Sequence, residues 1–337
     1  LEGQLLNTTA YSEAVNYGRS YQEYANTSHG FLLGFLWFFL GIILVSQGEV
    51  FWESNNIISI LLIPLSLLVR LSIFIKKTFI KKLTFKIPII CIGNIYIGGT
   101  GKTPLSIFLA QELKNIGKKP TIVKKFYKEH QDEHELIKNN FNSLILNKKR
   151  SKAIDEAVQK KFDTVILDDG FQDYRINKDI SILCFNQNQL IGNGRVIPAG
   201  PLRENFSSIK NAQIIIINGE KNLRFERKIL KENSKLSIFY IKYKPQNIEE
   251  LRRKKIIAVA GIGNPINFFN LLSEYKFKID KTIAFPDHYQ FSKSEILNIL
   301  NDAKKNDCQV LLTEKDYYKI QKYDLKEVKF LKVELEI

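Results

Sequence analysis

A run of glycines that ends in a lysine and a threonine is the clearest chemical signal in the sequence. The run is Gly98-Gly99-Thr100-Gly101-Lys102-Thr103. Glycines let backbone N–H groups turn inward around phosphate oxygens, and a helix that starts there adds the partial positive charge of its N-terminus. Lys102 would neutralise the terminal phosphates of ATP, and the Thr103 hydroxyl would bind Mg²⁺. The strict pattern GxxxxGK[ST] requires glycine where this chain has Tyr96, but the run still predicts binding of ATP and Mg²⁺.

Two adjacent carboxylates, Asp168 and Asp169, close the apolar run Thr164–Leu167. In a P-loop domain, a carboxylate at the C-terminal end of a buried parallel strand holds the Mg²⁺ of the bound nucleotide. The sequence Asp-Asp-Gly by itself is also typical of a simple turn. Together with the glycine-rich run, it predicts that both aspartates serve a metal site.

A loop rich in glycine and proline leads to a second charged pair, Arg203 and Glu204. The loop and the pair read GNGRVIPAGPLRE over residues 192–204. Such a loop has little ordering entropy left to lose, so it can aim an arginine at a phosphate and a glutamate at a metal ion. Physics alone is equally consistent with a rigid loop that carries a surface ion pair.

Two further sites are candidates for proton transfer, although neither stands out from its surroundings. His288 lies in the polar segment FPDHYQF beside Asp287, and an imidazole near a carboxylate can act as a base. A single histidine is, however, more often structural than catalytic. Asp132 and Glu133 lie in the charged stretch 124–135, which by itself predicts a solvated loop.

From residue 87 onward, short apolar strands alternate with amphipathic helices. The strand-like runs begin with PIICIG, PTIVKK, SLILN, DTVILDDG and ISILCFN, and helical patterns cover residues 104–116 and 151–160. This alternation predicts an α/β fold with a parallel sheet of the P-loop NTPase type in residues 87–210. A second series, from AQIIIING to KFLKVEL, predicts a second, smaller α/β domain in residues 211–337.

Two apolar segments precede these domains. Residues 1–49 contain one basic and four acidic residues, a net charge of −3, and the uncharged stretch 31–45 approaches the roughly 20 apolar residues that span a bilayer. This segment is either a transmembrane helix or an upstream reading frame translated by accident. Residues 50–86 join an apolar run to a lysine cluster, which predicts a helix that associates with an anionic membrane surface. The alternative is a helix buried in the first domain.

The net charge of +15 indicates an anionic partner such as a nucleic acid, a phospholipid headgroup or a phosphorylated substrate. Nucleic acid is disfavoured, because the basic excess concentrates beside the apolar helix instead of interleaving with aromatic residues on one surface. The three cysteines form no CxxC pair, which disfavours a thiolate metal site and a disulfide framework. No feature of the sequence indicates an obligate protein partner.

Taken together, the motifs resemble those of the tetraacyldisaccharide 4'-kinase family. IGNIYIGGTGKTP, the acidic pair 132–133, ILDDGFQDYRI, GNGRVIPAGPLRE, AGIGNP, FPDHYQF and LTEKD occur in the family's order over residues 51–337. The resemblance implies transfer of the ATP γ-phosphate to the 4'-hydroxyl of a tetraacylated glucosamine disaccharide 1-phosphate, a lipid A precursor, at the cytoplasmic face of the bacterial inner membrane. It also implies two α/β domains with the active site in the cleft between them, and an N-terminal helix that rests on the bilayer.

The resemblance also implies roles for individual residues. The implied catalytic residues are Asp132, His288 and Lys102; the implied ATP-binding residues are Gly98, Gly99, Thr100, Gly101, Lys102, Thr103 and Arg203; and the implied Mg²⁺ ligands are Thr103, Asp168, Asp169 and Glu204.

The chain departs from the family's pattern at three places. Asp173 stands where the family usually has a histidine, and an aspartate supplies neither an imidazole nor a cation. The segment KKFYKEHQDEHE, which contains Asp132, replaces a basic, glycine-rich loop of the family. Residues 1–49 have no counterpart in the family's motifs.

Regulatory ATPases of the deviant-Walker class are the main alternative, because they also combine a P-loop with a basic amphipathic membrane helix. Those proteins carry a lysine immediately before GGxGKT. This chain has Ile97 at that position, so the kinase resemblance is the better reading.

Overall fold

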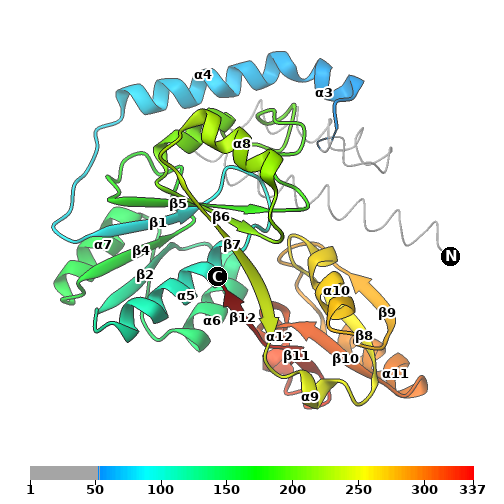
Figure 1. The fold of residues 1–337 in the computed structure, drawn as a ribbon. Helices are drawn as coiled ribbons and strands as arrows, with labels where there is room; N and C mark the ends of the chain where they lie inside the picture. Colours follow the sequence, from blue (N-terminus) through cyan, green and yellow to red (C-terminus); the bar gives the residue numbers. More distant parts are fainter. Residues whose placement is uncertain (1–51, 53) are drawn as a thin grey trace. The chain divides into compact units, whose positions relative to one another are not determined.

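The computed structural model describes residue 52 and residues 54–337, and the chain divides into two compact units (Figure 1). The P-loop unit contains residues 51–246 and 333–337, and the second unit contains residues 247–332. The boundary that the sequence placed at residue 210 therefore moves to residue 246, and the chain returns to the P-loop unit for its last strand. The candidate transmembrane helix in residues 1–49 lies outside the described residues.

An eight-stranded sheet forms the centre of the P-loop unit. Its order is β12-β7-β6-β5-β1-β4-β2-β3, and neighbouring strands are parallel except β7 and β12. The strands are β1 (Ile89–Gly93), β2 (Pro120–Lys125), β3 (Leu144–Asn147), β4 (Thr164–Asp168), β5 (Ile180–Asn186), β6 (Ile214–Asn218), β7 (Ser237–Pro245) and β12 (Val333–Glu336). The apolar run of β6 pairs with β5, with Ile216 opposite Cys184. This pairing is the reason that the unit continues past residue 210.

Helices connect the parallel strands. They are α5 (Lys102–Asn115), α6 (Gln131–Asn140), α7 (Arg150–Gln159) and α8 (Leu223–Glu232). Helices α5 and α7 correspond to the helical patterns predicted at residues 104–116 and 151–160. Helix α5 packs on β1, β2 and β4, and α7 packs on β2 and β3. In the register of β1 and β4, Ile92 lies opposite Asp168. The P-loop after β1 and the paired aspartates at the end of β4 therefore share one edge of the sheet, where α/β proteins bind ligands.

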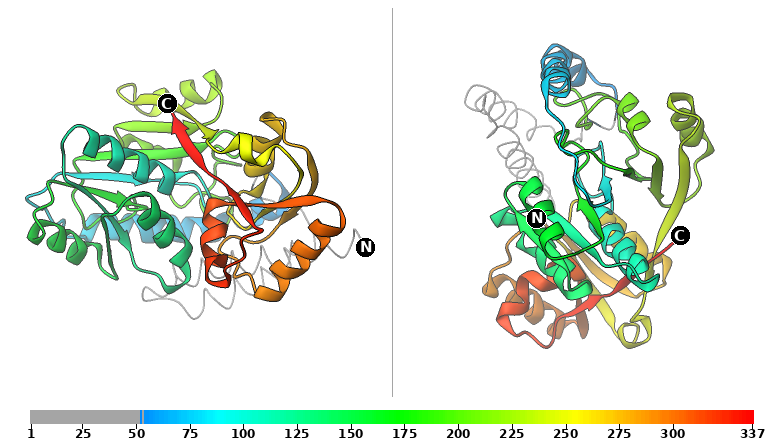
Figure 2. Two further views of the ribbon diagram at one scale, coloured as in Figure 1. Left: turned by 90° about the horizontal axis from the view of Figure 1, so that it is seen from below. Right: turned by 90° about the vertical axis from the view of Figure 1, so that its left-hand side faces the viewer.

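Helices α3 (Ile57–Leu61) and α4 (Ile63–Phe79) form the start of the described chain, and they lie apart from α5, α6 and α7 (Figure 2). Their large apolar side chains are exposed: Ile57, Ile60, Leu61, Leu67, Leu68, Leu71, Phe74, Ile75 and Phe79. The buried positions include Ser59, Ser66 and Ile73, which are seven residues apart and so share one helix face. The two helices are thus amphipathic in the opposite sense to the usual one: most of their apolar side chains face solvent and their serines face the protein. In the described part of the chain, no helix has the length and hydropathy to cross a bilayer.

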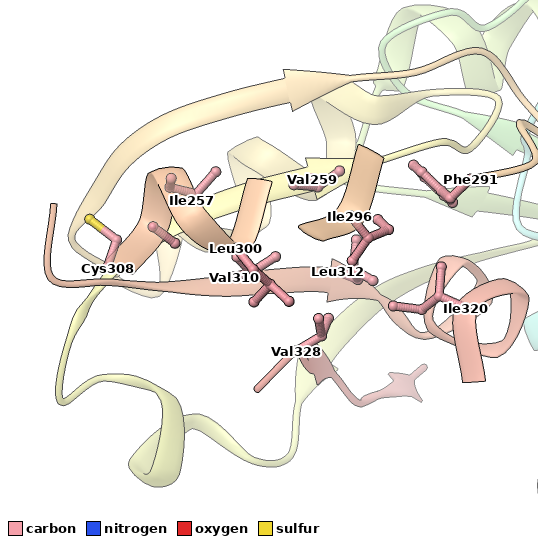
Figure 3. Packing of buried hydrophobic residues seen from close by; sticks show 11 residues of the cluster. Ile257, Val259, Phe291, Ile296, Leu300, Cys308, Val310, Leu312, Ile320 and Val328 are labelled. Atoms are coloured by element: carbon pink, nitrogen blue, oxygen red, sulfur yellow. The ribbon is translucent and has the colours of Figure 1, made fainter. Parts of the chain in front are cut away.

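The second unit is built around a four-stranded parallel sheet with the order β11-β10-β8-β9. The strands are β8 (Lys255–Ala260), β9 (Ile279–Ala284), β10 (Cys308–Thr313) and β11 (Lys329–Leu331), and the helices are α9 (Ile248–Leu251), α10 (Pro265–Glu274), α11 (Lys293–Lys305) and α12 (Glu314–Ile320). Ile296 and Leu300 of α11 pack against Val310 and Leu312 of β10 in one buried cluster (Figure 3). The prediction of an α/β fold with mostly parallel strands is confirmed for both units.

Candidate active site

The predicted P-loop connects β1 to α5 and has the backbone geometry that phosphate binding requires. Gly98 and Gly101 have φ angles of 112° and 84°, which favour glycine because a side chain would be strained there. The side-chain amide of Asn94 donates to the carbonyl of Gly98 (3.3 Å) and to the hydroxyl of Thr100 (3.0 Å). These bonds hold the loop in place, so Lys102 and Thr103 occupy the first turn of α5.

Asp168 is fully buried at the end of β4 and is held by two groups. The Thr103 hydroxyl donates to its Oδ2 at 2.9 Å, and Lys124 Nζ lies 2.5 Å from the same oxygen. Lys124 also pairs with Glu133 at 2.7 Å. Burial lowers the pKa of Lys124, but the carboxylates of Asp168 and Glu133 outweigh it and raise that pKa above its ordinary value. The Thr103–Asp168 contact is the arrangement that a P-loop metal site needs.

Asp169 belongs to a second charged group. Its backbone has a φ of 57°, and its carboxylate accepts from Arg203 at 3.1 and 3.3 Å and lies 3.7 Å from Lys102. Burial raises the pKa of Asp169, but Arg203, Lys102 and Lys124 outweigh it and hold that pKa well below the ordinary value. The structure therefore brings together Lys102, Asp169 and Arg203.

Glu204 is almost completely buried, and its Oε2 lies 2.5 Å from Nζ of Lys77 in α4. Oε1 of Glu204 and Oδ1 of Asp168 are buried and accept no hydrogen bond from the described residues. Unsatisfied carboxylate oxygens of this kind fit Mg²⁺, a hard cation that prefers oxygen ligands. Asp168, Asp169 and Glu204 do not, however, bring three ligand oxygens within 4.8 Å of one another. They are separate potential ligands instead of a compact carboxylate cluster.

Asp132 is only 3% exposed and lies in the first turn of α6, so the expectation of a solvated loop at residues 124–135 is corrected. Its Oδ1 accepts from the backbone N–H of Glu133 (2.9 Å). The physical reason is that Lys124 turns inward and attracts Glu133, which fixes the start of the helix. The adjacent His134 is also buried and stacks on Phe126; burial lowers the pKa of His134.

His288 lies in the second unit, in the loop that follows β9. Its φ is 57°, its N–H donates to Oδ1 of Asp287 (3.0 Å), and Asp287 pairs with Lys315 of α12 (3.0 Å). These contacts fix the backbone at His288. Asp132 belongs to the other unit, so the approach of Asp132 to His288 stays a prediction.

Arg150 was not singled out from the sequence, although it contacts two parts of the site. Its guanidinium donates to the backbone carbonyl of Asp169 (2.6 Å) and lies 3.6 Å from the carboxylate of Asp173. Asp173 is the residue that replaces the family's histidine. The pair therefore places a permanent cation beside the aspartate, in the region where the family pattern has an imidazole.

In the second unit, the motifs AGIGNP and LTEKD meet in a buried polar network. Asp316 accepts from the backbone N–H of Gly261 (2.7 Å) and from the Thr313 hydroxyl (2.6 Å). Lys319 pairs with Asp316 (2.7 Å) and donates to the carbonyl of Gly261 (3.0 Å). This network fixes the turn after β8, which assigns a structural role to these two motifs.

Comparison with known proteins gives a consistent result. Residues 58–337 match the family described as tetraacyldisaccharide-1-P 4'-kinase. The chain is 38% identical to the tetraacyldisaccharide 4'-kinase of Pelagibacter ubique (strain HTCC1062), over 85% of this chain and 92% of that protein. It is 31% identical to the protein of the same name from Rickettsia bellii (strain OSU 85-389), over 80% of this chain and 88% of that protein. Among solved structures, LpxK from Aquifex aeolicus in complex with ATP is similar, with a TM-score of 0.62, 24% identity, and coverage of 83% of this chain and 95% of that one.

Proposed function

Because this chain belongs to the tetraacyldisaccharide-1-P 4'-kinase family, we propose that it is a lipid kinase of lipid A biosynthesis. It transfers the γ-phosphate of ATP to the 4'-hydroxyl of a tetraacylated glucosamine disaccharide 1-phosphate. The observation that carries the proposal is the P-loop with its Thr103–Asp168 contact, next to the group formed by Lys102, Asp169 and Arg203. Two cations that converge on one carboxylate are well placed to bind a phosphate instead.

The residues of the P-loop unit then have distinct tasks. The loop from Gly98 to Gly101 binds phosphate oxygens through its backbone N–H groups, and Lys102 and Arg203 neutralise the charge on the transferred group. Thr103, Asp168, Asp169 and Glu204 are the candidate ligands of Mg²⁺, an ion that keeps several waters and is usually held by one or two carboxylates. When bound, Mg²⁺ would neutralise charge between the phosphates. Asp169 keeps its charge at any physiological pH, because its pKa lies below the ordinary value.

Asp132 and His288 are proposed as the pair that removes the proton from the sugar hydroxyl. A hydroxyl is a weak nucleophile near pH 7, so a positioned carboxylate or imidazole increases its reactivity. Asp132 is rigidly held at the start of α6. The backbone at His288 is held by Asp287, which pairs with Lys315. A side chain held as Asp132 is loses little entropy when the substrate binds.

The exposed apolar faces of α3 and α4 support a membrane location. We propose that this location is the cytoplasmic face of the bacterial inner membrane. Exposed apolar side chains along α4 are followed by Lys76, Lys81 and Lys82. An apolar face next to basic residues binds anionic bilayer surfaces. The acyl chains of the substrate lie in the same membrane, so this location brings enzyme and substrate together.

A direct assay tests the proposed reaction. The purified protein is incubated with γ-labelled ATP, Mg²⁺ and a tetraacyldisaccharide 1-phosphate in mixed micelles, and the product is identified by mass spectrometry. The expected product gains one phosphate at the 4'-position. DNA and casein serve as control acceptors. ATP hydrolysis that is independent of the lipid, with no lipid product, would favour the deviant-Walker ATPase class instead.

A further inference from the structure

The inward face of the helix pair α3 and α4 is attached to the loop that carries Arg203 and Glu204. The Ser59 hydroxyl donates to the carbonyl of Ala199 (2.6 Å), and the Ser66 hydroxyl donates to the carbonyl of Val196 (2.8 Å). The Trp52 indole N–H donates to the carbonyl of Pro198 (3.0 Å). Buried hydrogen bonds to backbone carbonyls are specific in position. The helix pair and the loop 192–204 are therefore one connected structure.

Lys77 continues this inward face toward the site. It follows Ile73 by four residues, so both side chains lie on the same side of α4, whereas the neighbouring Lys76 is rotated away and exposed. Lys77 Nζ lies 2.5 Å from Oε2 of Glu204 and 4.7 Å from the centre of the Tyr174 ring. The side chain of Lys77 is one-third exposed and that of Glu204 is 1% exposed. The contact thus holds a carboxylate that water does not reach.

Only one of the two carboxylate oxygens of Glu204 has a partner in the part of the chain that the structure describes. Oε2 binds the Lys77 ammonium, whereas the buried Oε1 accepts no hydrogen bond from the described residues. A buried carboxylate is costly unless each oxygen has a partner, so Oε1 is an oxygen suited to a cation. Mutation of a residue that orients a metal ligand typically weakens metal binding or activity about 10–100-fold.

We propose that Lys77 is a positioning residue for Glu204, so that the membrane-facing helix α4 sets the orientation of a ligand in the metal site. This inference rests on the metal role given to Glu204 in the proposed function. The apolar face of α4 is turned outward and its polar face holds the loop 192–204. Binding of α4 to lipid can therefore affect the phosphate site through two connections. One is the Lys77–Glu204 ion pair, and the other is the loop 192–204 that is bonded to α3 and α4.

The test compares Lys77→Met with Lys76→Met, which removes the same charge from the same helical turn. Mn²⁺ serves as the probe, together with the non-hydrolysable β,γ-methylene analogue of ATP, and free Mn²⁺ is measured by electron paramagnetic resonance. We expect Lys77→Met to weaken Mn²⁺ binding roughly 10–100-fold, as for other residues that orient a metal ligand. Lys76→Met should change it less than about twofold. Equal Mn²⁺ affinities for the two variants would overturn the proposal.

A double-mutant comparison separates positioning from a general effect on folding. If Lys77 acts through Glu204, adding Lys77→Met to Glu204→Gln should change Mn²⁺ affinity by less than about twofold. A full loss in that background would contradict the proposal, because Lys77 would then act elsewhere. Thermal melts and vesicle sedimentation of each variant report whether α4 stays folded and attached to lipid. Failure of the wild type to phosphorylate the lipid would reject the proposed function, and the Mn²⁺ measurements would still decide the role of Lys77.

Discussion

At the scale of single residues, each acidic side chain of the phosphate site is held by a cation from another segment of the chain. Asp168 is held by Lys124, Asp169 by Arg203 and Lys102, and Glu204 by Lys77. The motif residues could be predicted from the sequence, because glycines, Lys102 and the aspartates stand at fixed spacings. Lys124, Arg150 and Lys77 could not, because their roles depend on segments that only the tertiary fold brings together.

Lys102→Ala should abolish phosphoryl transfer and leave the fold intact. The Lys102 ammonium lies 3.7 Å from Asp169 and acts on the charge of the transferred group, whereas it fills no core position. Removing an electrostatic contact of this kind typically costs about 10²–10³-fold in turnover. Turnover and a circular dichroism melt are measured side by side. Retention of more than about a tenth of wild-type turnover would contradict the assignment.

Lys124→Met should destabilise the protein by roughly 3–5 kcal/mol, because it leaves the buried carboxylate of Asp168 without its cation. The pKa of Lys124 is raised in the folded state. Its contribution is therefore fully present at neutral pH, and it is lost only as the pH rises through that raised pKa. Urea unfolding at pH 7 measures the difference. Lys125→Met, a change at the next residue of β2, is the control and should stay within about 0.5 kcal/mol; equal losses for both would reject the buried-pair explanation.

At the scale of elements, the sequence pattern of α3 and α4 predicts a helix but does not predict which face of it is buried. The apolar run and the lysine cluster correctly predicted a helix, and Pro64 lies in its first turn, where proline is tolerated. The pattern left open which face is buried, because apolar residues occur nearly all round Ile57–Val69. The serines determine the buried face, because their hydroxyls donate to backbone carbonyls in the loop 192–204. That loop lies more than 120 positions away along the chain, which no local pattern can indicate.

Leu71→Glu should reduce binding to anionic vesicles by about tenfold or more, since burying one leucine side chain contributes roughly 1.5–3 kcal/mol. The matched control is Leu223→Glu in α8, because Leu71 and Leu223 are both 54% exposed. Vesicle sedimentation as a function of lipid concentration gives both affinities. The same loss in both variants would mean that added negative charge, and not the apolar face of α4, accounts for the effect.

At the scale of the whole molecule, the second unit is an insertion between β7 and β12 of the P-loop sheet. The sequence predicted two successive domains because the apolar run of β6 looks like any other buried strand, whereas the partly exposed β7 gives no such signal. Only the pairing of β6 with β5, and the return of the chain as β12, show that the first unit keeps these strands. The alternation of strands and helices was thus predictable, whereas α6, β7 and the assignment of strands to sheets were not.

The proposed pairing of Asp132 with His288, which belong to different units, gives a prediction at this scale. Asp132→Ala and His288→Ala should each lower kcat by roughly 10²–10⁴-fold with little change in the KM for ATP. If the proposed pair acts as one unit, the double variant should be scarcely slower than the more damaging single variant. Steady-state kinetics of the three variants check this. Losses that multiply fully would show that Asp132 and His288 act independently.

The antiparallel pairing of β7 with β12 has a consequence for how the protein unfolds. Pro245 and Val333 are direct partners in this pair. For the P-loop unit, the inserted residues 246–332 are therefore one long loop whose two ends the sheet holds together. The entropy of closing such a loop grows only slowly with its length. Unfolding of the inserted residues therefore adds only a small entropic cost to keeping β7 and β12 paired. Amides of β8 and β10 can exchange with solvent while those of β1 and β4 stay protected, and the molecule would lose its structure in two stages.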